Sequence, residues 1–122
     1  MNDIDIAWMA GFYEGEGTIY CYTSKHTTKK GLKRTYTKLK MAITQNDMEP
    51  LLKCKKILSY LDINGPYKNK TSKNLHYQLN AQNEYALKFI STIYPHLSNR
   101  RRIQADKAIL KYKTTSKEEI ND

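Results

Sequence analysis

Two glutamates near the N-terminus stand where carboxylates are unfavourable unless a cation neutralises them. Glu14 and Glu16 lie in the stretch Met9–Gly17, at the expected C-terminal end of a helix, where the macrodipole is already negative. A divalent ion would reverse this penalty, because Mg²⁺ and Ca²⁺ bind carboxylate oxygens together with the unpaired carbonyls of a helix end. The stretch therefore predicts a cation site. The alternative is an ordinary helix end with two exposed acidic residues, which Gly17 terminates in a left-handed conformation.

The same expected helix carries two glycines on one face. Gly11 and Gly15 are four residues apart, and each glycine in a helix interior costs about 0.5–1 kcal/mol relative to alanine. Trp8 and Phe12 lie on the same side of the helix. This stripe indicates that a second helix approaches closely at the glycines.

The charge balance favours a polyanionic partner. Lys and Arg number 21 and Asp and Glu 12, which gives a net charge of +9 in 122 residues; charge alone does not choose between DNA, RNA and an anionic membrane. No apolar run approaches the roughly 18 residues of a membrane helix, and no signal-peptide pattern opens the chain. We therefore expect an intracellular protein, in whichever cytoplasm, organelle or phage-infected cell holds the nucleic acid.

Other chemistries find no support in the sequence. Cys21 and Cys54 have no metal-ligand spacing, and the three histidines are scattered, which argues against a disulfide framework or a zinc nuclease. The motifs of ATPases, dehydrogenases and serine hydrolases do not occur. We expect two reduced thiols and no small-molecule substrate.

Hydrophobic periodicity predicts an α+β domain over residues 1–113, followed by a polar, flexible tail over 114–122. Helices are expected at 3–15, 47–61, 82–94 and 100–113, with Asn2 or Asp3 and then Asp47 as N-caps. Strands are expected at 18–24, 34–44, 66–70 and 75–80. Four strands with helices on one face leave the other face solvated or against a partner.

The sequence MAGFYEGEG resembles the LAGLIDADG signature of homing endonucleases position by position, with Ala10, Gly11, Gly15 and Gly17 in register. The segments ITQND and YPHLSNRRRIQADKAIL also resemble later parts of that family, and the similarity covers most of residues 6–112. The resemblance implies an αββαββα fold with a four-stranded antiparallel sheet and helices on one face. It also implies a DNA-cutting enzyme of a mobile genetic element.

The resemblance assigns roles to individual residues. Glu16 matches the metal-binding acid and the Gly15 carbonyl the backbone ligand beside it, with Mg²⁺ as cofactor and Ca²⁺ or Mn²⁺ as substitutes. Glu14 matches the acid that supports the turn. Gln45 matches the residue that holds metal-bound water, the alternative being a polar strand end. Arg101 is our first choice for the catalytic basic residue and Arg100 the second, with Arg102 also competing for the role.

A single motif without an internal repeat implies two chains. In this family two such helices pack together, so the resemblance implies a homodimer through Trp8, Gly11, Phe12 and Gly15 and a near-palindromic DNA site. The expected function is metal-dependent, site-specific cleavage of double-stranded DNA. The alternatives are a cleavage-deficient DNA-binding regulator or RNA-splicing maturase on the same scaffold, or a basic protein of unrelated fold that coats nucleic acid.

Alternation along the expected strands separates a core face from a basic, aromatic face. Leu39, Met41 and Ile43 fall on one parity of strand 34–44, and Tyr36, Lys38 and Lys40 on the other. Such a face can bind a major groove, its cations contacting guanine or phosphate and its Gln adenine; the alternative is a solvated face. The candidate DNA-binding residues are Tyr20, Tyr22, Ser24, Lys25, Lys29, Lys30, Lys33, Arg34, Tyr36, Lys38, Lys40, Lys68, Lys70, His76 and Gln78.

Overall fold

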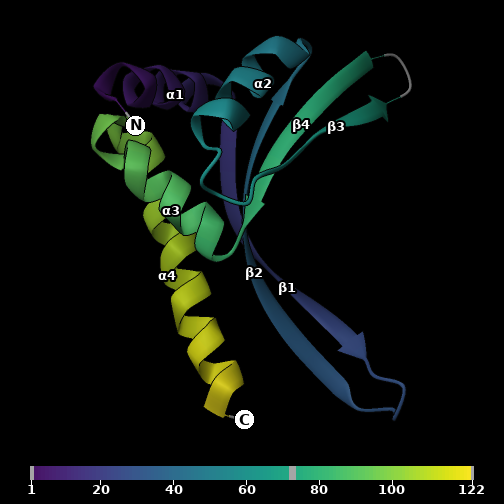
Figure 1. Ribbon diagram of the computed structural model, residues 1–122. Coiled ribbons are helices and arrows are strands. Elements are labelled where there is room, and N and C mark those ends of the chain that lie inside the picture. The colour runs from purple at the N-terminus through teal and green to yellow at the C-terminus, as the bar shows by residue number, and fades with distance from the viewer. Residues whose placement is uncertain (1, 72–73, 122) are drawn as a thin grey trace.

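The computed structural model describes residues 2–71 and 74–121. Its elements follow one another as α1 (Asp3–Glu16), β1 (Gly17–Thr27), β2 (Lys33–Gln45), α2 (Met48–Ile57), β3 (Asn64–Thr71), β4 (Asn74–Gln82), α3 (Glu84–Ile93), a 3-10 turn η1 (Tyr94–His96) and α4 (Asn99–Asn121) (Figure 1). This order confirms the expected αββαββα succession of elements.

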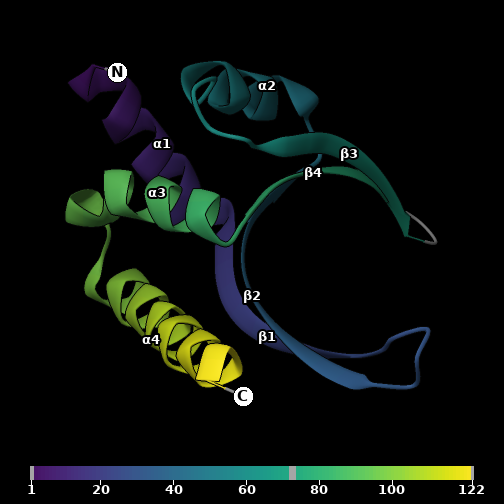
Figure 2. The same cartoon turned by 60° about the horizontal axis from the view of Figure 1, so that its bottom comes forward.

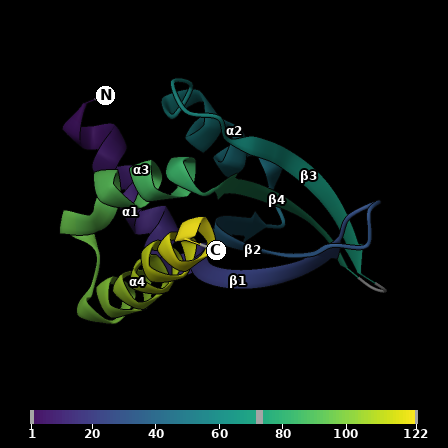
Figure 3. The same cartoon turned by 90° about the horizontal axis from the view of Figure 1, so that it is seen from below.

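The four strands form one antiparallel sheet in the order β1-β2-β4-β3. Seen along its edge, the sheet is strongly curved, with the helices outside the curve and its concave face open (Figure 2). The view from below shows the same separation of helices and hairpins (Figure 3). The prediction of helices on one face is therefore confirmed. None of the described helices is long and apolar enough to cross a membrane.

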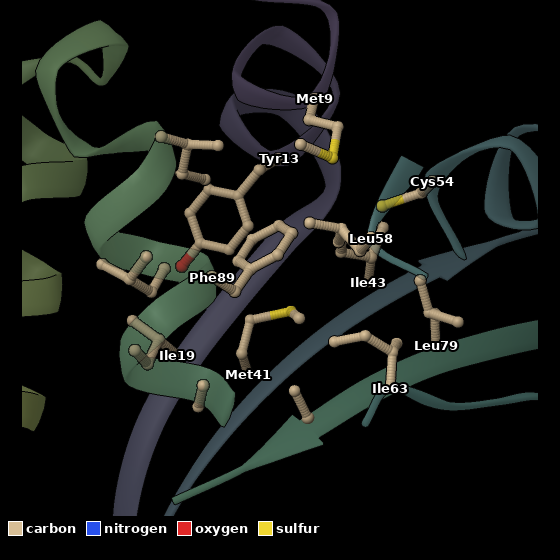
Figure 4. Close-up of a cluster of buried hydrophobic side chains, with 14 of the residues drawn as sticks. Met9, Tyr13, Ile19, Met41, Ile43, Cys54, Leu58, Ile63, Leu79 and Phe89 are labelled. Carbon is tan, nitrogen blue, oxygen red and sulfur yellow. The ribbon is translucent and has the colours of Figure 1, made fainter. Parts of the chain in front are cut away.

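The core lies between the helices and the convex face of the sheet. Leu39, Met41 and Ile43 of β2 are fully buried, which confirms their predicted face. Beside Met41 and Ile43, Tyr13 of α1 meets Phe89 of α3 with ring centroids 5.8 Å apart (Figure 4). Burying each such side chain stabilises the fold by about 1.5–3 kcal/mol, so this cluster fixes α1 against the sheet.

The helix starts agree with the capping residues expected from the sequence. The Asn2 side chain accepts a hydrogen bond from the backbone N–H of Asp5 at 2.8 Å, so Asn2 rather than Asp3 caps α1. The Asp47 side chain accepts one from the N–H of Glu49 at 3.0 Å. Each cap satisfies a backbone donor that the first turn of a helix leaves unpaired.

Two predicted helix ends are wrong. α2 ends at Ile57 instead of residue 61, although Leu58 and Leu61 are still buried, because an apolar pattern reports burial whether or not the helix continues. α4 runs on through Asn121, whereas the predicted helix ends at residue 113. Residues 113–121 contain no Gly or Pro to stop the helix.

Gly17 does not adopt the expected left-handed conformation. Its φ of −87° and ψ of 157° are extended, and it is the first residue of β1. A Cβ at this position would lie 2.1 Å from Cδ2 of Tyr13. The buried Tyr13 ring, and not the backbone conformation, therefore requires glycine here.

Candidate nucleic-acid interface and metal site

The two glutamates of the motif have different surroundings. The Glu14 carboxylate accepts hydrogen bonds from the backbone N–H of Ser98 at 2.7 Å and from the Ser98 hydroxyl at 2.9 Å. The backbone hydrogen bond from Ser98, followed by its hydroxyl and the positive charge of Arg101, holds the pKa of Glu14 below its usual value against a smaller opposing effect of desolvation. Glu14 thus links the end of α1 to the start of α4.

Arg101 is buried beside this link. Its Nε donates to the Glu14 carbonyl at 3.0 Å, and its Nη1 donates to the Gly17 carbonyl at 2.7 Å and to Oε1 of Gln104 at 3.0 Å. The two carbonyls bracket Gly15 and Glu16. Because its guanidinium is occupied by backbone oxygens, Arg101 is placed to hold the turn.

The neighbouring arginines differ from Arg101. Arg102 donates to the carbonyls of Tyr94 and Pro95, so it fastens η1 to α4. Arg100 is exposed, and its charge contributes to the lowered pKa of Glu14. Of the three candidates, Arg100 is the one whose side chain is exposed beside the motif.

Glu16 is the last residue of α1 and is exposed. Across residues 2–71 and 74–121, no hydrogen bond or ion pair engages its carboxylate. The start of β1 lies beside the end of β2, since Gly17 pairs with Ile43, so Gln45 belongs to the same end of the sheet. The Gln45 Oε1 accepts a hydrogen bond from the N–H of Asn46 at 2.8 Å.

The donors at this end suit a hard cation, but one chain offers few of them. A carboxylate, an amide and helix-end carbonyls are oxygen ligands of the kind that Mg²⁺ and Ca²⁺ prefer. Within the described part of the chain, no group of three or more His, Cys, Asp or Glu residues could hold a metal ion. The residues therefore fit a divalent ion as one part of a larger ligand set.

One face of α1 is uncovered in the single chain. Gly11 and Gly15 are exposed, and a Cβ added at either would meet nothing within 4 Å. Trp8 and Phe12 are half-buried, and their ring centroids are 5.3 Å apart. Lys53 of α2 places its ammonium 4.2 Å from the centre of the Trp8 ring. Packing among residues 2–71 and 74–121 therefore requires neither glycine.

The concave face of β1 and β2 carries cations and aromatic rings in facing pairs. The register joins Tyr20 to Lys40, Tyr22 to Lys38, Ser24 to Tyr36 and His26 to Arg34. These residues alternate with the buried Ile19, Leu39 and Met41, so they share the open side of the sheet. On β4, Gln78 faces Thr44, and His76 has the same parity.

Several predicted DNA-binding residues do not join this face. Lys25 falls on the opposite parity from Ser24 and His26, and Lys68 pairs with Tyr77, on the helix side of the sheet. Lys29 and Lys30 form the exposed turn of the β1–β2 hairpin, and Lys33 starts β2. The Lys70 side chain lies outside the described residues.

The structure also places residues on the open face that the sequence did not single out. Asn64 faces Asn80, Tyr67 faces Gln78, and Gln82 faces Lys40. The β3 register shifts between Asn64 and Tyr67, which breaks the strict alternation from which strand faces were predicted. The Asn and Gln residues along β4 were an available signal for Gln82, but they say nothing of Asn64 and Tyr67 on β3.

Comparison with known proteins agrees with this arrangement. The model of the LAGLIDADG endonuclease family matches residues 9–113. The structure of the intron-encoded homing endonuclease I-CeuI with DNA is similar at a TM-score of 0.69 and 18% identity, over 99% of this chain and 59% of that one. The homing endonuclease I-CvuI gives 0.61 and 21%, over 86% and 65%, and I-TnaI gives 0.57 and 22%, over 80% and 64%. No curated protein matches the chain.

The αββαββα fold with its open concave sheet is the homing-endonuclease fold. By its match over residues 9–113, the chain belongs to the LAGLIDADG endonuclease family. It spans less than two thirds of the length of these three solved structures.

Proposed function

We propose that the protein is a site-specific, metal-dependent endonuclease that cuts double-stranded DNA as a homodimer. One observation carries this proposal. Glu16 stands exposed at the end of a helix whose glycine face is open, whereas Glu14, two residues earlier, is committed to Ser98. A carboxylate that has no partner among the described residues, beside an uncovered helix face, is what a site completed by a second chain requires.

In the proposed dimer, the two copies of α1 pack through Gly11 and Gly15, with Trp8 and Phe12 at the sides of the contact. The absence of side chains at the glycines lets two helix backbones approach closely. Two Glu16 carboxylates then come together, and like charges at such distances repel unless cations lie between them. A two-fold arrangement predicts a near-palindromic target.

The concave face is the proposed DNA surface. Its Tyr–Lys pairs and Arg34 offer positive charge and hydrogen-bond donors to phosphates and base edges. The I-CeuI and I-CvuI structures with the same fold are complexes with DNA or with a target, which supports this assignment. The exposed lysines of the β1–β2 turn, Lys29 and Lys30, would contact phosphates.

The chain's own residues have distinct roles in the proposed reaction. Glu16 and the Gly15 carbonyl would hold a divalent ion, which when bound supplies an activated water and stabilises the leaving oxygen. The Gln45 amide orients water beside that position. Arg100 presents a positive charge to the phosphate, and Arg101 keeps Glu16 in place by holding the backbone on both sides of it.

The test is a nicking assay on a DNA library with Mg²⁺, comparing the parent with Glu16→Gln. We expect cleavage only by the parent, with binding retained in both and loss of cleavage when EDTA is added. The matched control is Asp106→Asn, a carboxylate on α4 that contacts Tyr94 and should leave cleavage intact.

Three outcomes would contradict the proposal. Specific DNA binding by the parent without cleavage in Mg²⁺ or Mn²⁺ would favour a regulator or maturase. Equal cleavage by the parent and Glu16→Gln would remove Glu16 from the site. Sedimentation of the DNA complex as one protein chain would contradict the dimer.

A further inference from the structure

The open face of the sheet has two chemically different halves. Arg34, Lys38 and Lys40 place three cations on the β2 side. On the β4 and β3 side, the side chains facing the same way include Asn64, Gln78, Asn80 and Gln82, here called the amide patch. We propose that the amide patch reads A·T base pairs within each half of the DNA target, whereas the cationic half supplies most of the phosphate affinity. This inference rests on the proposed function.

The members of the amide patch are brought together by the strand register. Asn80 lies between Ala42 of β2 and Asn64 of β3, and Gln78 lies between Thr44 and Tyr67. The β2 neighbours of Asn80 and Gln78 are small, whereas Gln82 lies beside Lys40. Asn64, Gln78 and Gln82 are half-buried, so they are confined by the sheet and still reachable by a ligand.

Asn80 orients its two neighbours. It is only 7% exposed. Its Nδ2 donates to Oε1 of Gln78 at 3.4 Å, and its Oδ1 accepts from Nδ2 of Asn64 at 3.5 Å. These contacts turn the oxygen of Gln78 and the amino group of Asn64 toward Asn80. The Gln78 amino group and the Asn64 oxygen are then available to a ligand, so these two side chains present one donor and one acceptor side by side, and Gln82 adds a further amide.

One border of the amide patch, away from the Lys40 that faces Gln82, disfavours a phosphate. Asn64 and Gln82 line a hollow of about 310 Å³ together with Asp62 and Glu84. Two carboxylates at the border of the patch repel an anionic backbone, whereas a neutral base edge carries no such penalty. A surface of neutral amides within a basic sheet is therefore suited to base edges.

The pattern of donor and acceptor favours adenine over guanine. In the major groove adenine presents an acceptor at N7 and a donor at N6, whereas guanine presents acceptors at both N7 and O6. The Asn64 oxygen would oppose the guanine O6. A well-formed contact of this kind discriminates between bases by about 5- to 150-fold.

The experiment selects bound sites from a randomised DNA library with the full chain and with Gln78→Ala and Lys38→Ala. In the parent we expect a run of A·T preference at equivalent positions of the two half-sites. Gln78→Ala should weaken that preference by about 5-fold or more while leaving the dependence of affinity on salt unchanged. Lys38→Ala should keep the preference and reduce the slope of log affinity against log salt by about 0.9 for each subunit, or about 1.8 for the dimer.

The outcomes separate this inference from the proposed function. If the parent binds specific sites but Gln78→Ala keeps every base preference, or if no A·T positions are selected, the inference alone is overturned. If the folded parent binds no DNA even at low salt, the proposed function fails and the inference fails with it. Gln82→Ala provides a second variant in case Gln78→Ala is poorly folded.

Discussion

Arg101 should be among the most sensitive positions in the protein to truncation. Replacement by Met keeps the aliphatic stem but removes the donors to the carbonyls of Glu14 and Gly17. An acceptor left unpaired in a buried place costs about 1–3 kcal/mol. The bond to Gly17 is buried and the bond to Glu14 is part-buried, so we expect a loss of about 2–4 kcal/mol in the free energy of unfolding. This is a large part of the about 5–15 kcal/mol that stabilises a typical domain.

Urea unfolding followed by far-UV circular dichroism measures this loss. The matched control is Lys107→Met, an exposed position on the same helix, which should stay within about 0.5 kcal/mol of the parent. Arg101→Lys keeps the charge but cannot present two donors in a fixed fork, so its loss should be intermediate. If Arg101→Met were as stable as Lys107→Met, the hydrogen bonds from Arg101 to the carbonyls of Glu14 and Gly17 would contribute nothing to the free energy of unfolding.

The folded Arg101→Lys protein offers a second measurement. If Arg101 positions the turn that carries Glu16, cleavage should require more Mg²⁺ while DNA affinity stays that of the parent. An unchanged Mg²⁺ requirement would leave Arg101 with a purely structural role. The comparison thereby distinguishes a positioning residue from one that only stabilises the fold.

Two further predictions concern the same turn. Gly17→Ala should lower the free energy of unfolding by about 1–3 kcal/mol or more, because its Cβ would overlap the buried Tyr13 ring. The control is Ser59→Ala, since Gly31→Ala at the exposed hairpin turn would be strained at its φ of +79°. If Gly17→Ala melted at the same temperature as this control, the overlap with the Tyr13 ring would be contradicted. The pKa of Glu14 is lower in the folded protein than in the unfolded chain. The Glu14 carboxylate therefore stabilises the fold at pH values above its ordinary pKa, and this stabilisation is lost as the pH falls through the folded pKa. The melting temperature of the parent should therefore fall more steeply below about pH 5 than that of Glu14→Gln, and parallel curves would refute this.

The sequence was sufficient to predict an element and its faces where the spacing of apolar residues matched their burial in the fold. Leu39, Met41 and Ile43 alternate with Lys38 and Lys40, so both faces of β2 could be predicted. Asn2 and Asp47 were recognisable because a cap depends only on residues nearby in the chain. The motif also marked the end of α1, and its acidic residues could be named before the fold was known.

The rest depended on contacts between distant residues. Nothing local distinguishes Arg101 from Arg100, since the difference is which side chain meets carbonyls from the end of α1. The packing role of Gly17 depends on where the Tyr13 ring lies. The side of the sheet on which Asn64 lies could not be predicted, because the register of β3 shifts between Asn64 and Tyr67 and breaks the alternation.

The hydrogen bonds that join the end of α1 to the start of α4 have a consequence during synthesis. Ser98 and Arg101 contact Glu14 and Gly17 across 84 positions, so the N-terminal turn gains its final anchor only after α4 has begun to emerge from the ribosome. A nascent chain that already displays its basic hairpins would still have an unanchored Glu16. In this order of events, the proposed DNA surface forms before the proposed metal site is anchored.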